Sequence, residues 1–287
     1  MYKPTLITLF AGGGGSSLGS KNAGCDELLA IDYEKNACDV LKLNNPKLKV
    51  WQKDMREVKS PQILEATGLQ VGELDILSGS PPCPGFSQQN INRGPDNQLN
   101  KLLYTNMRFI KELQSKVFII ENVTGMVRGD MKDFWLKAQK TLNTLGYFVR
   151  WEIMNASHYG VPQARERVII IGIRKDIGII PTFPEPDLNN IISFHDSIGK
   201  DGYIRTTFGG EVFSGDKWLF SRKCTTNRNL RHHQYCKKHH SISLIAPLLK
   251  VLILLMQFLS HIYCIHFNKN TIMYYAINDC FSMNSCS

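Results

Sequence analysis

The strongest constraint on the fold is an alternation, before residue 176, of short apolar runs with amphipathic stretches. Continuous apolar runs of this length are typical of strands buried on both faces, and helices between them cover a parallel sheet. Right-handed crossovers then predict a doubly wound, mostly parallel α/β fold. The expected strands are Thr5–Phe10, Leu28–Ile31, Leu74–Leu77, Val117–Ile120, Val149–Ile153 and Val168–Ile173, with a shorter run at 48–51 and helices such as 98–114 and 131–145.

A glycine-rich turn follows the first apolar run. In doubly wound folds ligands bind at the carboxyl ends of the strands, so the residues after each run are the informative ones. Gly12–Gly15 allows a ligand close to the backbone, and Asp32, at the end of the second run, suits ribose hydroxyls. Ser17 stands where a dinucleotide fingerprint needs its third glycine. The pattern therefore favours an adenosine-type cofactor, with a tight turn and a surface aspartate as the alternative, and Asp54 adds an acid at the same edge.

The run Leu74–Leu77 leads into a cysteine surrounded by prolines. Pro81, Pro82 and Pro84 restrict the backbone on both sides of Cys83, which is how a strand-end nucleophile is held rigid. A buried free cysteine is the alternative, although a core needs no prolines around it.

Two further strand ends carry ionisable residues. Glu121 follows an apolar run, so burial should make its carboxyl hold a proton more tightly and allow it to protonate a substrate nitrogen. Gln163, Arg165 and Arg167 alternate before the last run, and two guanidiniums on one face could anchor a phosphate or a carbonyl oxygen. A turn without chemistry and a solvated edge strand remain the alternatives at these two places.

The order of these motifs resembles the DNA (cytosine-5)-methyltransferase family of bacterial type. The resemblance rests on F-A-G-G-G-G at 10–15, the acid at 32, P-P-C at 81–83, E-N-V at 121–123 and Q-A-R-E-R at 163–167. It extends through Asn97–Leu99 and Asn155–Pro162 as far as residue 199. It implies a catalytic domain of the S-adenosylmethionine-dependent methyltransferase type at 1–199 and a remnant of the target-recognition region with an atypical tail at 200–287.

The resemblance also implies roles for single residues. Cys83 matches the nucleophile that adds to carbon 6 of cytosine, and Glu121 matches the carboxyl that engages ring nitrogen N3. Arg165 matches the guanidinium that orients the ring oxygen and the catalytic loop, with Arg167 in support. Because carbon 5 is out of reach inside a duplex, the base must flip out, and residues 84–104 match the loop that closes on it.

The methyl donor implied by the resemblance is S-adenosylmethionine. It would lie over the Gly12–Gly15 turn with Asp32 on the ribose and Pro82 near the sulfonium. Residues expected around the rest of the cofactor site are Phe10, Gly12, Gly13, Gly14, Gly15, Tyr33, Asp54, Met55 and Leu99. No metal is expected in this chemistry.

Two departures from the family pattern are small and one is large. Thr8 stands where many members have Asp, and Pro84 follows Cys83 where Gln is usual. The family's Gly-Asn-x-Val-x-Pro segment is absent because no glycine follows Gly215. That segment leads into a helix beside the cofactor, so we expect residues 217–287 to be an unevolved tail and the chain to be a poor methyltransferase.

The composition of the tail supports this expectation. The net charge is +1 over residues 1–216 and +8 over residues 217–287, so a basic total is a weak argument for nucleic acid. A basic nucleic-acid module, a membrane segment at 251–265 and a metal site at Cys224, Cys236, His239 and His240 are the weaker interpretations of the same stretch.

The expected setting and partners follow from the same residues. The N-terminus opens straight into glycines and is no signal peptide, so a cytoplasmic, reducing compartment and free cysteines are expected. Double-stranded DNA is the expected substrate of a monomer without membrane contact, and a cognate restriction endonuclease is the expected partner in the cell. P-P-C followed by E-N-V excludes a nicotinamide oxidoreductase. An RNA cytosine methyltransferase and a catalytically impaired DNA-binding remnant stay open.

Overall fold

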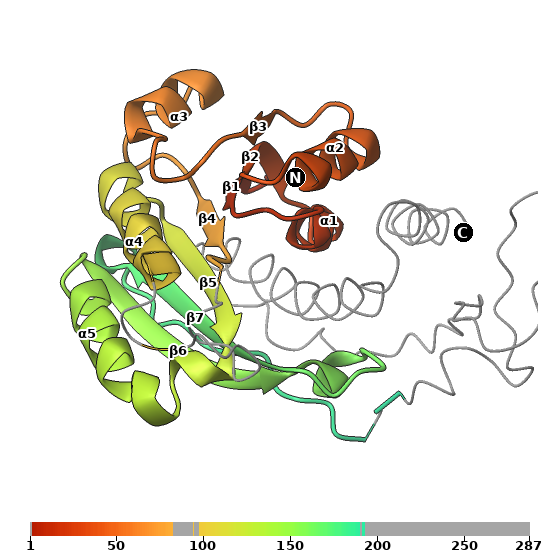
Figure 1. Cartoon of the computed structure of the whole chain (residues 1–287), viewed down its shortest axis with the longest axis vertical. Helices are drawn as coiled ribbons and strands as arrows, with labels where there is room; N and C mark the ends of the chain where they lie inside the picture. The colour runs from red at the N-terminus through yellow and green to blue at the C-terminus, as the bar shows by residue number, and fades with distance from the viewer. Residues whose placement is uncertain (1, 83–93, 95–97, 190, 193–287) are drawn as a thin grey trace, which may run out of the picture.

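A seven-stranded sheet flanked by helices forms the body of the protein (Figure 1). The computed structural model describes residues 2–82, 94, 98–189 and 191–192. The strands are β1 (Thr5–Leu9), β2 (Asp26–Asp32), β3 (Val50–Gln52), β4 (Ile76–Gly79), β5 (Val117–Val123), β6 (Tyr147–Asn155) and β7 (Glu166–Arg174). The α-helices are α1 (Gly15–Asn22), α2 (Lys35–Asn44), α3 (Ser60–Thr67), α4 (Lys101–Leu113) and α5 (Lys132–Asn143).

The predicted α/β class is confirmed, and every expected apolar run lies in or overlaps a strand. The amphipathic stretch 98–114 contains α4, preceded by a short 3₁₀ turn at Gln98–Asn100, and 131–145 contains α5. Apolar residues at helical spacing explain α4, whose buried side chains include Leu103, Met107 and Ile110.

The strand order is β3-β2-β1-β4-β5-β7-β6, and all pairs from β3 to β5 are parallel. β7 runs antiparallel to both of its neighbours, so the sheet is mostly rather than wholly parallel. The physical reason is the connection at 156–165, which contains a 3₁₀ turn and no α-helix. A parallel return normally needs a longer crossover, usually through a helix, whereas a short connection produces an antiparallel pair.

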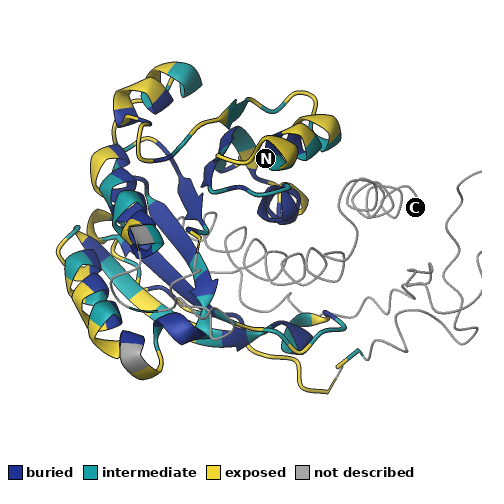
Figure 2. Cartoon of the chain, in the orientation of Figure 1, coloured by how far each residue is buried: buried dark blue, intermediate teal, exposed yellow. Residues whose placement is uncertain are grey.

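Both faces of the sheet are buried, as continuous apolar strands require. Ile7, Ile120 and Phe109 belong to the core on the face covered by α3, α4 and α5, whereas Leu6 and Ile119 belong to the core on the opposite face. Figure 2 shows the result: β1, β4, β5 and β7 are mostly buried, the edge strands β3 and β6 are partly exposed, and helices such as α3 and α5 are exposed on their outer sides.

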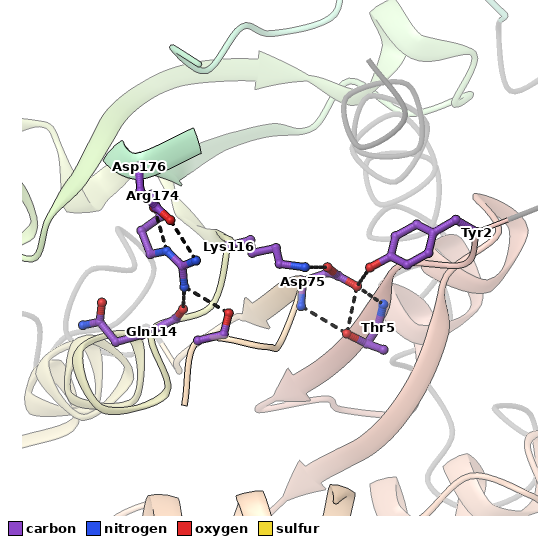
Figure 3. Close-up of polar contacts among 8 residues, drawn as sticks. Tyr2, Thr5, Asp75, Gln114, Lys116, Arg174 and Asp176 are labelled. Carbon is purple, nitrogen blue, oxygen red and sulfur yellow. Dashed lines mark hydrogen bonds and ion pairs between the residues drawn. The ribbon is translucent and has the colours of Figure 1, made fainter. Parts of the chain in front are cut away.

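The amino ends of the strands are held by buried polar contacts (Figure 3). Asp75, immediately before β4, accepts hydrogen bonds from the Tyr2 hydroxyl at 2.6 Å and the Thr5 amide at 2.8 Å, and pairs with Lys116 at 2.7 Å. These contacts join the starts of β1, β4 and β5 at the edge opposite to the predicted site. This edge is therefore structural, which leaves the carboxyl edge for ligands.

The carboxyl edge contains the topological switch point. The chain moves from β1 to β2 on one side and later returns to β4 on the other, so the ends of β1 and β4 diverge around a crevice. In open α/β sheets this crevice is where ligands bind. The Gly12–Gly15 turn and the Pro81–Pro82 segment leave the sheet at this point.

Several expectations fall on residues outside this description. Cys83, the loop 84–97 apart from Gly94, the boundary at 199 and the tail 217–287 are among them. Among the residues that the structure describes, none of the helices has both the length and the hydrophobicity of a membrane span. The same residues contain no group of three or more His, Cys, Asp or Glu side chains that could bind a metal ion. Cys25 and Cys38 are free and buried, as expected of reduced thiols.

Candidate active site

The turn after β1 has a backbone that only glycine adopts easily. Gly12 and Gly14 have φ angles of 56° and 95°, and a Cβ on Gly14 would lie 2.7 Å from Leu41. A Cβ on Gly12 would meet nothing within 4 Å, so open space lies beside this backbone. Phe10 also has a positive φ of 55°, an uncommon conformation for a residue with a side chain. The turn therefore presents bare backbone at the switch point, as a close-fitting ligand requires.

Asp32 ends β2 and faces this turn. Its Oδ2 accepts a hydrogen bond from the Gly12 amide at 2.8 Å, and its Oδ1 accepts one from the Glu34 amide at 2.9 Å. Each carboxylate oxygen has a further lone pair, so both can also accept a hydroxyl proton. The aspartate thus holds the glycine turn in place and keeps the capacity to bind a ribose.

Backbone hydrogen bonds gather the other predicted cofactor residues at the same edge. The Ala11 amide donates to the Ile31 carbonyl at 3.0 Å, and the Lys53 amide donates to the Asp32 carbonyl at 2.8 Å. These bonds join the ends of β1, β2 and β3, and so place the glycine turn beside the segment that carries Asp54 and Met55.

The predicted cofactor residues differ in accessibility. Tyr33 is 65% exposed, Pro82 is exposed and Leu99 is half-buried, whereas Met55 is 2% exposed and belongs to the core. The Asp54 carboxylate receives hydrogen bonds from the Arg56 amide and guanidinium, and these bonds keep its pKa below the usual range. Tyr33 is thus free to lie against a ring, whereas Asp54 would approach a ligand while bound to Arg56.

The Pro81–Pro82 segment is anchored on both sides. The Ser80 amide donates to the Leu9 carbonyl at 3.4 Å, which connects the segment to the end of β1. Asn122 is buried in β5 and donates from Nδ2 to the Pro81 carbonyl at 3.3 Å. Cys83 follows two residues later and lies outside the described residues. Its predicted role stays a prediction, although the chain entering it is held in place.

Glu121 and Arg167 form a largely buried ion pair beside this segment. Glu121 lies opposite Ile169 and Arg167 lies opposite Val123 in the antiparallel β5–β7 pair, so the two side chains are diagonal neighbours on one face. Arg167 Nε lies 2.9 Å from Glu121 Oε1, and the two side chains are 14% and 15% exposed.

The environment of Glu121 raises the pKa of its carboxyl, which is the direction expected from its place after an apolar run. Burial raises the pKa of the Glu121 carboxyl, while the charge of Arg167 and hydrogen bonds from Ser80 and Arg167 oppose the rise. A carboxyl with a raised pKa can hold a proton and donate it to a substrate nitrogen.

Arg165 is positioned by Asn155 at the end of β6. The Asn155 side-chain oxygen accepts hydrogen bonds from the Arg165 amide at 3.1 Å and from the Ser157 amide and hydroxyl at 3.1 and 2.9 Å. These hydrogen bonds hold both ends of the connection at 156–165 against the end of β6. The ion pair with Glu121 belongs to Arg167, the arginine expected in a supporting role, and the division of labour between the two arginines stays a prediction.

Sequence reasoning assigned no role to four residues that organise this edge: Ser80, Arg108, Asn122 and Asn155. Asn122 and Asn155 lie within recognisable motifs, and a buried asparagine at a strand end is a usable signal because its amide must find partners. Arg108 is half-buried on α4, and nothing in the local sequence pattern distinguishes it from a solvated arginine.

Comparisons with known proteins point to one family. A family model described as C-5 cytosine-specific DNA methylase matches residues 5–279. The type II methyltransferase M.XorII of Xanthomonas oryzae pv. oryzae is 36% identical over 188 residues, which are 65% of this chain and 44% of that protein. M.AquIA of Picosynechococcus sp. is 34% identical over 189 residues, covering 63% of this chain and 75% of that protein.

A solved structure extends the likeness to three dimensions. It is described as a DNA modification methyltransferase encoded within a prophage (E. coli), and it superposes with a TM-score of 0.60 at 27% identity. The match covers 68% of this chain and 54% of that one. The chain thus spans only about half the length of most of these relatives.

Proposed function

Because the chain belongs to the C-5 cytosine-specific DNA methylase family, we propose that it serves methyl transfer from S-adenosylmethionine to carbon 5 of cytosine in DNA. The observation that carries the proposal is the buried Glu121–Arg167 pair next to the anchored Pro81–Pro82 segment. This arrangement supplies a proton donor, a fixed cation and a rigid approach to Cys83 at the switch point of the sheet.

The residues at the glycine turn fit the methyl donor. Gly12 offers bare backbone and open space, and the Asp32 oxygens have lone pairs left for ribose hydroxyls. Tyr33 and Met55 would border the adenine, Asp54 would lie near its amine, and Pro82 would lie near the sulfonium. When bound, the cofactor supplies an electrophilic methyl group.

The chemistry needs the cytosine ring activated before it can accept that methyl group. The Cys83 thiolate would form a bond from sulfur to carbon 6, which places electron density on carbon 5. Glu121 would donate its proton to N3, so the ring does not accumulate negative charge. Carbon 5 would then take the methyl group as the methyl–sulfur bond breaks and its electron pair stays on sulfur. Loss of the carbon 5 proton to a base would expel the Cys83 thiolate and restore the double bond between carbons 5 and 6, and N3 would return its proton to Glu121.

Arg167 would keep Glu121 in place throughout this cycle. After Glu121 gives up its proton it becomes a buried carboxylate, which is costly without a partner. The guanidinium 2.9 Å away offsets that cost, and Arg165 would orient the ring oxygen. The target base must leave the DNA duplex to reach these groups, so we propose base flipping as part of the reaction.

The proposed partners follow from the same function. Double-stranded DNA is the substrate, and a cognate restriction endonuclease of the same system is the partner in the cell, since curated relatives are type II methyltransferases. We propose that the protein acts as a monomer in the cytoplasm.

The test is covalent trapping with DNA containing 5-fluorocytosine, in which fluorine replaces the carbon 5 hydrogen and so blocks the elimination that would release the Cys83 thiolate. The parent chain should form an adduct in the presence of S-adenosylmethionine, and Cys83→Ser should form none while binding the cofactor equally well. Glu121→Gln should form the adduct at least about a hundredfold more slowly, the lower range for loss of a general acid.

The same experiment separates the alternatives. An adduct with fluorocytosine RNA and none with DNA would identify an RNA methyltransferase. DNA binding without any adduct would identify a catalytically impaired remnant. Labelling of a cysteine other than Cys83 would refute the assignment of the nucleophile.

A further inference from the structure

We propose that Arg108 is a positioning residue for the cofactor site, because it holds the segment that carries Asp54 and Met55. The inference rests on the proposed function, since it takes this segment to be the adenine side of the cofactor site. Arg108 lies on α4, outside the motifs on which the resemblance above rests, and its side chain contacts the connection between β3 and α3.

The contacts of Arg108 are made to backbone rather than to side chains. Its Nη2 donates to the Met55 carbonyl at 3.2 Å and to the Val58 carbonyl at 2.9 Å. Met55 and Val58 are 2% and 1% exposed, so water cannot easily replace a lost donor at these carbonyls. Losing the guanidinium would leave the carbonyls of two buried residues without this partner.

A second residue of α4 also contacts this segment. Glu112, one turn after Arg108, lies 3.4 Å from the Arg108 guanidinium. Its carboxylate accepts a hydrogen bond from the Ser60 hydroxyl at 2.5 Å. Arg108 and Glu112, on consecutive turns of α4, therefore bind the two ends of the segment from Met55 to Ser60.

The held segment is directly connected to the glycine turn. The Lys53 amide, two residues before Met55, donates to the Asp32 carbonyl. The Asp32 carboxylate in turn accepts a hydrogen bond from the Gly12 amide. Displacement of residues 54–58 would therefore move Asp54 and Met55 relative to Asp32 and the turn. A ligand that needs ribose and adenine contacts at once is sensitive to such a displacement.

The chain contains a matched control at the opposite edge of the sheet. Arg174 also pairs with an acid, Asp176, and donates to two backbone carbonyls, those of Gly72 at 3.1 Å and of Gln114 (Figure 3). The chemistry is the same as at Arg108, but these contacts lie at the amino edge, away from the glycine turn. Removing Arg174 should therefore disturb stability without disturbing the cofactor site.

The experiment compares the full chain with Arg108→Met, Arg108→Lys and Arg174→Met. We expect Arg108→Met to weaken S-adenosylmethionine binding by about tenfold in calorimetry, equivalent to the loss of one good hydrogen-bonded contact. Hydrogen exchange of the peptide 53–60 without cofactor should become faster in the same variant. Arg108→Lys should have an affinity and an exchange rate between those of the parent and Arg108→Met, because an ammonium keeps the charge but cannot reproduce the planar guanidinium.

The control decides between positioning and general support. Arg174→Met should lower the thermal midpoint but leave the affinity within about twofold of the parent and the exchange at 53–60 unchanged. An equal loss of affinity in Arg174→Met, or normal affinity and exchange in Arg108→Met, would overturn the inference. A parent chain that binds no cofactor would refute the proposed function, and the exchange comparison would still decide whether Arg108 holds the segment.

Discussion

Replacement of Glu27 by Gln should stabilise the fold at neutral pH and leave its stability in acid almost unchanged. Glu27 lies on β2 under α1, where its Oε1 accepts hydrogen bonds from the Thr8 hydroxyl at 2.5 Å and the Ser17 hydroxyl at 2.8 Å. Thr8 and Ser17 are 2% and 1% exposed. Burial raises the pKa of Glu27 to about 6, although the two hydroxyl hydrogen bonds act against this rise.

The size and the sign of the effect follow from the pKa in the two states. The ordinary pKa of 4.5 applies to the unfolded chain and about 6 to the folded chain, so between these values the folded chain binds more protons. The free energy of unfolding therefore falls as pH rises from about 4.5 to about 6, by about 2 kcal/mol in total, and stays level above that. Glutamine keeps an oxygen for Thr8 and Ser17 but cannot ionise, so it avoids this loss.

The assay is urea unfolding of the full chain and of Glu27→Gln at pH 4.5, 5.5 and 7.5. The variant should exceed the parent by up to about 2 kcal/mol at pH 7.5 and converge with it at the lowest pH. Glu65→Gln, at an exposed position of α3, is the control and should show a difference that does not change with pH. A Glu27→Gln variant that is less stable than the parent at pH 7.5, or a difference equal at all three pH values, would refute the reasoning.

Three further outcomes are expected. Gly172→Ala should destabilise the fold by about 1–3 kcal/mol in urea unfolding, because its Cβ would lie 2.0 Å from the Phe118 ring; no change would mean that the ring moves freely. Gly14→Ala should cost at least about 1 kcal/mol, because it combines a φ of 95° with a contact of 2.7 Å to Leu41; Gly24→Ala, also at positive φ but in open space, should cost less. Asp32→Ala should weaken S-adenosylmethionine binding by about 1–3 kcal/mol in calorimetry, and unchanged affinity would remove Asp32 from the site.

Local pattern was sufficient to predict the α/β class and to select candidate site residues at one edge of the sheet. The apolar runs identified the strands because a strand buried on both faces must be apolar throughout its length. The glycine turn, Asp32, the proline segment and Glu121 were found because each follows such a run, and the carboxyl ends of parallel strands meet at one edge. The family resemblance added roles to these positions.

Pairing between distant parts of the chain was decided only by the tertiary structure. The direction and register of β7 place Arg167, rather than Arg165, diagonally opposite Glu121. Pattern within one strand cannot determine this, because the pairing register depends on the neighbouring strand and on the connection at 156–165. Similarly, Arg108 of the amphipathic helix α4 holds residues 55–58 only because α4 packs beside that segment. Candidate reactive residues can thus be identified from short stretches of sequence, whereas their partners depend on packing between elements far apart in the sequence.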